Sequence, residues 1–136
     1  MKTIITTIAF LLASLMTHAQ LRGSGITVQK TFAYKSFDKI NFENLNGKLE
    51  VEIGMPFSIS VIIDDNLESL LQVEENASEN ILTVRFKDNK NNNKYIENTH
   101  FKIKITLPEA SVIKNTGNSN VIVNNVIGKN ITCNFY

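Results

Sequence analysis

The 136-residue sequence contains a single cysteine, two histidines, two prolines and no tryptophan. The lone cysteine, Cys133, excludes an intrachain disulfide, so packing has to stabilise the fold even in an oxidising compartment. One of the two histidines, His18, lies in an N-terminal segment that has the features of a leader. A histidine triad or a multi-histidine metal site would therefore have to be built around His100 alone.

The sequence also lacks an excess of charge of either sign, since its 14 basic and 13 acidic side chains are interspersed along it. Loss of Lys2 with a leader would bring the formal net charge to zero. A near-neutral chain has neither an electrostatic footprint for nucleic acid nor a polybasic patch for an anionic membrane. We therefore expect no nucleic-acid partner, and we expect no cofactor because no nucleotide-binding loop or zinc-ligand spacing occurs.

Long apolar runs are missing except at residues 4–16, directly after Lys2. About 13 residues suit the hydrophobic region of a signal peptide, whereas a transmembrane helix needs about 20. Ala19 supplies a small residue for cleavage before Gln20, and an uncleaved anchor is the alternative. The expected organisation is a signal peptide at residues 1–19 and one exported domain at residues 20–136, without a membrane span after cleavage and without a cysteine placed to carry a lipid.

What the sequence does contain is strict alternation of apolar and polar residues. This period of two predicts half-buried β-strands, with one face on a core and one face in water, and the β-branched and aromatic residue types agree. The residues expected on the core side are Leu49, Val51, Ile53, Phe57, Ile59, Val61, Ile63, Leu82, Val84, Phe86, Phe101, Ile103, Ile105 and Leu107. The chain is predicted to be all-β.

Two turns and one short helix interrupt these strands. Asn46-Gly47 either closes a hairpin or carries the chain into the next course of a solenoid, and Gly54-Met55-Pro56 forms a second turn. One helical turn is expected near residues 65–71. There Asp65 and Glu68 have the spacing of a capping box, and the competing interpretation makes Asp64, Asp65 and Glu68 a cation site.

Two polar stretches separate strands in the second half of the chain. The segment "KDNKNNNKYIENTH" is predicted to be a mobile loop, with residues 88–99 the first target of a protease. Later, Val112, Val121, Val123 and Ile131 recur about every ten residues with asparagine-rich turns between them. Such spacing indicates a β-solenoid, or β-helix-like stack of short strands, or else a sandwich.

Several stretches resemble the head-GIN domain family, whose members are also named auto-transporter adhesins. The resemblance covers nearly all of residues 20–136 and rests on "GSGITVQKTFAYKSFDKINF", "LEVEIG", "SISVIIDDNLESLLQVE", "ILTVRF" and "KIKITLP" followed by "NTGNSNV". It implies an exported β-helical protein of a Gram-negative bacterium, in the periplasm or at the cell surface. Members usually continue for several further solenoid courses, so the chain resembles a shortened, C-terminally incomplete member.

Few residues are candidates for chemistry. Glu50 and Glu52 share one strand face about 7 Å apart, within reach of a carboxylate pair, although solvation explains them equally well. Cys133 alternates with apolar neighbours and is predicted to be a small core residue, while His100 is expected to be exposed. Asn76-Ala77-Ser78 and Asn130-Ile131-Thr132 fit the glycosylation sequon, a short pattern that is frequent by chance.

No catalytic, cofactor-binding or metal-binding residue is therefore predicted. The first functional hypothesis is a non-catalytic binding or adhesin-like module for a glycan or protein partner. The alternatives are a polysaccharide hydrolase or lyase on the same scaffold, and a truncated product without function.

The last residues also predict an association. Ile131, Cys133 and Phe135 alternate like a strand, and no charged residue follows Lys129 to cover them. We expect self-association through this strand, unless Tyr136 and the segment around Ile26 fold back as a cap.

Overall fold

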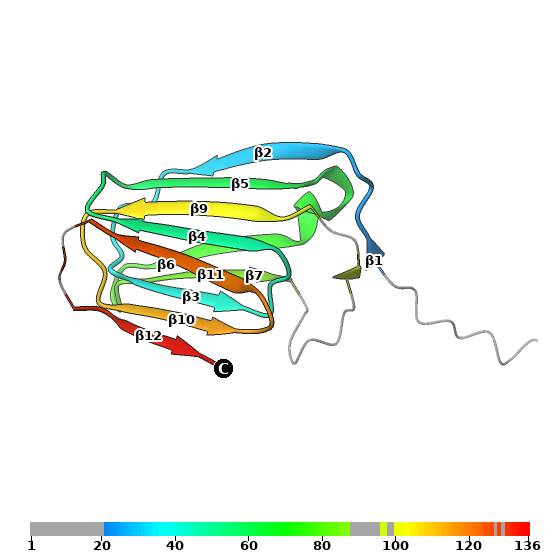
Figure 1. Cartoon of the computed structure of the whole chain (residues 1–136). Helices are drawn as coiled ribbons and strands as arrows, with labels where there is room; N and C mark the ends of the chain where they lie inside the picture. Colours follow the sequence, from blue (N-terminus) through cyan, green and yellow to red (C-terminus); the bar gives the residue numbers. More distant parts are fainter. Residues whose placement is uncertain (1–20, 88–95, 98–99, 127, 129) are drawn as a thin grey trace, which may run out of the picture.

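The computed structural model describes residues 21–87, 96–97, 100–126, 128 and 130–136. The expected leader at residues 1–19 lies outside them, as do residues 88–99 of the predicted mobile loop apart from Ile96 and Glu97. Within the described residues, two five-stranded sheets face each other (Figure 1), and no helix is long and apolar enough to cross a membrane. The chain is mostly β, as the alternation predicted.

One sheet, here the β4 sheet, has the strand order β11-β4-β9-β5-β2. Its strands are β11 (Asn120–Asn125), β4 (Lys48–Ile53), β9 (Lys102–Leu107), β5 (Ser58–Asp64) and β2 (Thr27–Phe32).

The other, the β3 sheet, has the order β12-β10-β3-β7-β6. Its strands are β12 (Thr132–Phe135), β10 (Val112–Thr116), β3 (Lys39–Glu43), β7 (Ile81–Phe86) and β6 (Leu71–Asn76). A short pair, β1 (Leu21–Arg22) with β8 (Ile96–Glu97), stands apart from both sheets.

Parallel pairing dominates the middle of both sheets. Strands β12, β10, β3 and β7 are parallel neighbours, and so are β11, β4 and β9, while β6, β5 and β2 add antiparallel strands at one end. The chain passes from one sheet to the other between β3 and β4, and again between β10 and β11. Successive passes therefore stack side by side in register, as Figure 1 shows.

The core lies between the two sheets and confirms the predicted alternation. All the residues expected on the core side are buried except Phe57, which is half-buried and packs edge-on against Phe37 with ring centroids 5.2 Å apart. Parallel strands set these residues in rows, such as Leu82, Ile40 and Ile113 across β7, β3 and β10. Burial of such rows is the main stabilising contribution available to a chain without disulfides.

The expected helical turn is present as a 3₁₀ helix, η1 (Asp65–Leu70), but the predicted capping box is wrong. The residue before the helix is Asp64, and its side chain makes no capping hydrogen bond. Leu67 is buried and the aspartate side chains bond elsewhere, because segments distant in sequence offer them donors. The cation alternative has no support either, since no group of three or more potential ligands is arranged for a metal in the described part of the chain.

The Asn46-Gly47 turn joins the two sheets, so the hairpin alternative is wrong. Strand β3 before it pairs with β7 and β10, whereas β4 after it pairs with β9 and β11. The turn lies between two other connecting segments, the one that leads into β11 and the one that leads into β9. The Gly47 N–H donates to Ser119 Oγ at 3.2 Å, and the Lys48 N–H donates to the carbonyl oxygen of Phe101 at 2.9 Å.

This stacking predicts that Gly47→Ala is destabilising by about 1–3 kcal/mol. A Cβ at Gly47 would collide with the backbone carbonyl of Phe101, which is fixed by its own hydrogen bond to Lys48. Chemical denaturation measures the loss. Gly25→Ala is the matched control, because Gly25 also has a positive φ of +85° but has open space around the added atom. Equal losses in the two variants would show that the close approach contributes nothing.

At the β12 end of the core, the prediction that Cys133 is buried is wrong, and the alternative of a cap has no support. Cys133 is exposed rather than buried, although it continues the row of Ile113. The reason is that β12 extends the β3 sheet past β11, the last strand of the β4 sheet, so no strand lies opposite it in the described residues. Tyr136 and Ile26 are 77% and 66% exposed, so they do not fold over this end as a cap.

Candidate functional site

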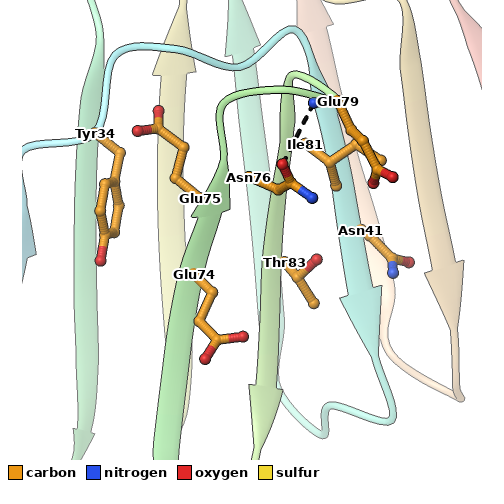
Figure 2. Close-up of a pocket in the computed structure, with 8 residues that line it drawn as sticks. All are labelled: Tyr34, Asn41, Glu74, Glu75, Asn76, Glu79, Ile81 and Thr83. Atoms are coloured by element: carbon orange, nitrogen blue, oxygen red, sulfur yellow. Dashed lines mark hydrogen bonds between the residues drawn. The ribbon is translucent and has the colours of Figure 1, made fainter.

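A groove of about 560 Å³ lies beside β6, β7 and β3. Figure 2 shows its lining, which comes from those three strands, from the turn between β6 and β7, and from the segment that follows β2. The lining residues are Tyr34, Asn41, Glu74, Glu75, Asn76, Glu79, Ile81 and Thr83. Acidic and amide side chains make up most of this set.

Strand register places the polar side chains in rows on the outer face of the β3 sheet. Glu74 on β6 stands opposite Thr83 on β7, and Thr83 stands opposite Asn41 on β3. Directly opposed side chains in a sheet have Cβ atoms about 5 Å apart. The three residues therefore form a continuous polar strip across three strands, with Asn76 and Ile81 in the next row.

Hydrogen bonds fix part of this strip and leave part of it open. The Asn41 amide nitrogen donates to Glu43 Oε1 at 2.8 Å, while its Oδ1 is buried and has no partner among the described residues. Glu74 Oε2 lies 3.6 Å from the guanidinium of Arg85, and Glu74 also accepts a hydrogen bond from Gln72. An orphaned buried acceptor is costly, and Asn41 Oδ1 would become available to a ligand donor only if the side chain turned towards the groove.

The edge of the groove is held by the segment after β2. The Tyr34 hydroxyl donates to the carbonyl oxygen of Val73 at 3.2 Å, and the Ser36 N–H donates to Glu75 Oε1. At the turn between β6 and β7, Asn76 Oδ1 accepts the Glu79 N–H at 3.4 Å (Figure 2), and it also accepts the Ser78 hydroxyl at 2.7 Å. These contacts pre-organise both walls of the groove.

The chemistry available in the groove is hydrogen-bond acceptance. Its lining holds carboxylates, amides and two hydroxyls, and none of the eight residues is a lysine, arginine, histidine, cysteine or serine. Adjacent residues on a strand point to opposite faces, so Glu74 and Glu75 do not form a facing carboxylate pair. The arrangement suits a polar ligand rich in hydroxyl donors and does not contain a nucleophile with a paired base.

The sequence-predicted carboxylates lie elsewhere, on the outer face of the β4 sheet. Glu50 is 2.8 Å from Lys48 Nζ and 3.6 Å from Lys102 Nζ, and Glu52 is 3.0 Å from Lys104 Nζ. The hydrogen bond from Lys48 lowers the pKa of Glu50, with Lys102 acting in the same direction and partial burial acting against them. Glu50 is therefore held ionised in an ion-pair ladder, which is the opposite of what a general acid needs.

His100 is exposed, as predicted, but it has a buried partner that the sequence did not reveal. The carboxylate of Asp64 is fully buried and accepts the backbone N–H groups of His100 at 2.7 Å and of Gly25 at 3.0 Å. His100 Nδ1 lies 3.3 Å from Asp64 Oδ1.

Burial alone would raise the pKa of Asp64. The hydrogen bonds from the His100 and Gly25 backbones, together with the His100 ring, outweigh burial and lower the pKa below its ordinary value. The carboxylate therefore stays ionised and ties together three segments that are distant in the sequence. We read this contact as stabilising rather than catalytic.

Sequence reasoning missed the groove because its residues look like ordinary solvent-facing positions. Tyr34, Asn41 and Thr83 alternate with core residues in the same way as any polar strand residue. Only the pairing of β6, β7 and β3 brings them together. Of the two sequons, Asn76 lines the groove with its side chain hydrogen-bonded, and Asn130 is exposed.

Solved structures with a similar fold come from Parabacteroides and Bacteroides species. A putative adhesin from Parabacteroides merdae has a TM-score of 0.61 at 21% identity, covering 78% of this chain and 42% of its own. A putative lipid binding protein from Parabacteroides distasonis has a TM-score of 0.64 at 22% identity, covering 77% and 44%. A putative adhesin from Bacteroides fragilis has a TM-score of 0.61 at 21% identity, covering 83% and 57%.

The chain thus spans about half the length of these similar structures, and identities of this size establish the fold alone. No curated protein matches the sequence. The sequence model of the family described as "Putative auto-transporter adhesin, head GIN domain" matches residues 36–135, which is most of the chain and contains the strands of the groove. The chain belongs to the head GIN domain family.

Proposed function

We propose that this chain is an exported, non-catalytic binding module whose groove beside β6, β7 and β3 holds a glycan. The observation that carries the proposal is the row of Glu74, Thr83 and Asn41, which presents carboxylate, hydroxyl and amide oxygens side by side. Glycans offer a matching series of hydroxyl donors. The adhesin names of the family and of similar structures support a binding role, and they are not names of enzymes.

The same proposal includes a cellular location and a fold type. A signal peptide at residues 1–19 would direct the domain at residues 20–136 to the periplasm or the surface of a Gram-negative bacterium. The in-register stacking of parallel strands supports a β-solenoid-like description of strands β7, β3, β10 and β12 in one sheet and β9, β4 and β11 in the other.

A lipid ligand is the second candidate, because one similar structure is described as a putative lipid binding protein. The groove does not favour it. An acyl chain requires an apolar wall, and Ile81 is the one aliphatic side chain among the eight lining residues.

We expect Thr83→Val to weaken glycan binding by about three- to tenfold, because it removes one hydrogen bond worth about 1 kcal/mol and keeps the side-chain shape. A glycan array identifies the ligand for the unaltered chain, and titration calorimetry with that ligand measures the change. Asn41→Leu, which removes the amide from the same row, should also weaken binding.

Thr31→Val is the matched control, since Thr31 is an exposed β2 residue on the other sheet. The proposal fails if the unaltered chain binds no glycan, or if Thr31→Val weakens binding as much as Thr83→Val does. Release of new reducing ends from the bound glycan would contradict the non-catalytic assignment and favour the hydrolase alternative.

A further inference from the structure

The polar row of the groove continues beyond the groove. Glu74, Thr83 and Asn41 form its first part, and they lie side by side in Figure 2. Strand register then extends it, since Asn41 on β3 stands opposite Lys114 on β10, and Lys114 stands opposite Asn134 on β12. We call these five residues the long row. Strand alternation places it on the outer face of the β3 sheet, away from the core, and it crosses all five strands.

Every member of the long row carries a hydrogen-bonding group. In order, these groups are a carboxylate, a hydroxyl, an amide, an ammonium group and a second amide. The next row on one side contains Ile81 on β7 and Val112 on β10, which are both half-buried. A sugar ring has hydroxyl groups around its rim and C–H groups on its faces, so the long row suits the rim and the two aliphatic side chains suit a face.

Side-chain contacts on this face run sideways from the long row and not along it. Glu74 Oε2 lies 3.6 Å from the guanidinium of Arg85, and Lys114 Nζ lies 5.6 Å from the centroid of the Tyr136 ring. No side-chain hydrogen bond or ion pair joins two members of the long row, all of which are described residues. The row is thus oriented from one side, and its groups keep donors and acceptors for a ligand.

The spacing of the long row restricts the shape of the ligand. Neighbouring strands are about 4.8 Å apart, so the five side chains span about 19 Å and the three in the groove span about 10 Å. An extended chain of β-linked hexoses advances by close to one strand spacing for each sugar, whereas an α-linked chain of the amylose type coils. Only the extended chain offers hydroxyl groups to successive strands in register.

Charge restricts the chemical class of the ligand. Glu74, Glu75 and Glu79 line the groove, none of its eight lining residues is basic, and Lys114 is the one basic member of the long row. A glycan that carries carboxylate or sulfate groups would meet like charge in the groove, which costs affinity. A neutral glycan meets no such repulsion.

We propose, on the basis of the function proposed above, that the glycan is a neutral, extended, β-linked chain that crosses the strands with one sugar on each strand. Three sugars occupy the groove beside β6, β7 and β3. The next two lie over β10 and β12, where Lys114 and Asn134 donate hydrogen bonds to their hydroxyl oxygens. The site therefore binds a stretch of a polymer and not a single terminal sugar.

Titration calorimetry of the chain, purified after export, with cello- and chito-oligosaccharides tests the proposal. Both series have the extended β-linked backbone. We expect affinity to rise about ten- to thirtyfold from the trimer to the pentamer, because two further hydrogen bonds form, and to change little from the pentamer to the hexamer. Malto-oligosaccharides, which coil, should show no such rise.

Variants locate the added sugars. Lys114→Met removes the ammonium group and keeps the length of the side chain, so it should reduce the gain from trimer to pentamer about three- to tenfold. Thr83→Val should instead weaken the trimer and the pentamer alike. Lys102→Met is the matched control, because Lys102 is a half-exposed strand lysine on the outer face of the β4 sheet, and it should leave the gain unchanged.

The outcomes separate this proposal from the function on which it rests. If no glycan of the array binds, both fail. If a glycan binds but neither β-linked series shows a gain from trimer to pentamer, the binding module stands and the extended chain is overturned. The same holds if Lys114→Met reduces the gain no more than Lys102→Met does. Tighter binding of β-linked oligomannuronate than of the neutral chains would overturn the neutral class.

Discussion

Replacing Ile103 with aspartate should unfold the domain. Ile103 is fully buried in β9, the middle strand of the β4 sheet, between Leu49 on β4 and Val61 on β5. The change deletes a buried aliphatic side chain, which costs about 2–5 kcal/mol, and an unpaired carboxylate in its place costs several more. Domains of this size are stable by about 5–15 kcal/mol, so circular dichroism and thermal melting should show little folded protein at 25 °C.

Lys104→Asp is the control, because it puts the same residue at the next position of the same strand. Lys104 is half exposed and pairs with Glu52 at 3.0 Å. Losing this pair and placing a carboxylate opposite Glu50 should cost about 1 kcal/mol. Similar melting shifts for the two variants would mean that the strand register is wrong.

The strands could be predicted from sequence because each sheet has one face buried in the core and one face exposed to solvent. Under that condition the pleat forces a period of two, and residues such as Leu49, Val84 and Ile105 identify the inner face without knowledge of the partner strands. The pairing itself is non-local. Nothing in the order of the residues says that β3 lies between β7 and β10, so whether Asn46-Gly47 closes a hairpin or joins two sheets could not be decided.

The errors have the same origin. Cys133 has the local pattern of a core residue, and β12 does continue the core row, but burial also requires a strand opposite. The groove depends on three strands that the sequence does not place together. In the sequence, Asp64 stands out only as part of a local acidic cluster beside the expected helix cap, whereas its hydrogen-bond donors are 36 and 39 residues away. Local competition between a capping bond and a distant donor is invisible until the segments are paired.

Asp64→Ala is expected to have the second-largest effect on stability, a loss of about 3–5 kcal/mol. The carboxylate is fully buried and receives the backbone N–H groups of Gly25 and His100, so its removal leaves two partly buried donors without this acceptor. Each such donor costs about 1–3 kcal/mol. Urea denaturation at pH 7 measures the loss. Asp65→Ala is the control, because Asp65 is exposed and its side chain accepts a hydrogen bond from the Ser24 hydroxyl, while its backbone N–H bond to Ile26 survives the substitution, so the change should cost less than about 1 kcal/mol.

Asp64 also determines part of the response to acid. Since its pKa in the folded chain lies below the ordinary value of 3.8, ionised Asp64 stabilises the fold above that value. This contribution is lost as the pH falls through the folded-state pKa, because the protonated carboxyl accepts the Gly25 and His100 N–H groups less well. Asp64→Asn, which keeps the shape without the charge, should therefore be less stable than the unaltered chain at pH 7 and should lose less further stability as the pH falls from about 5 to about 2. Parallel stability curves for the two proteins over this range would show that the buried carboxylate of Asp64 does not control the loss of stability in acid.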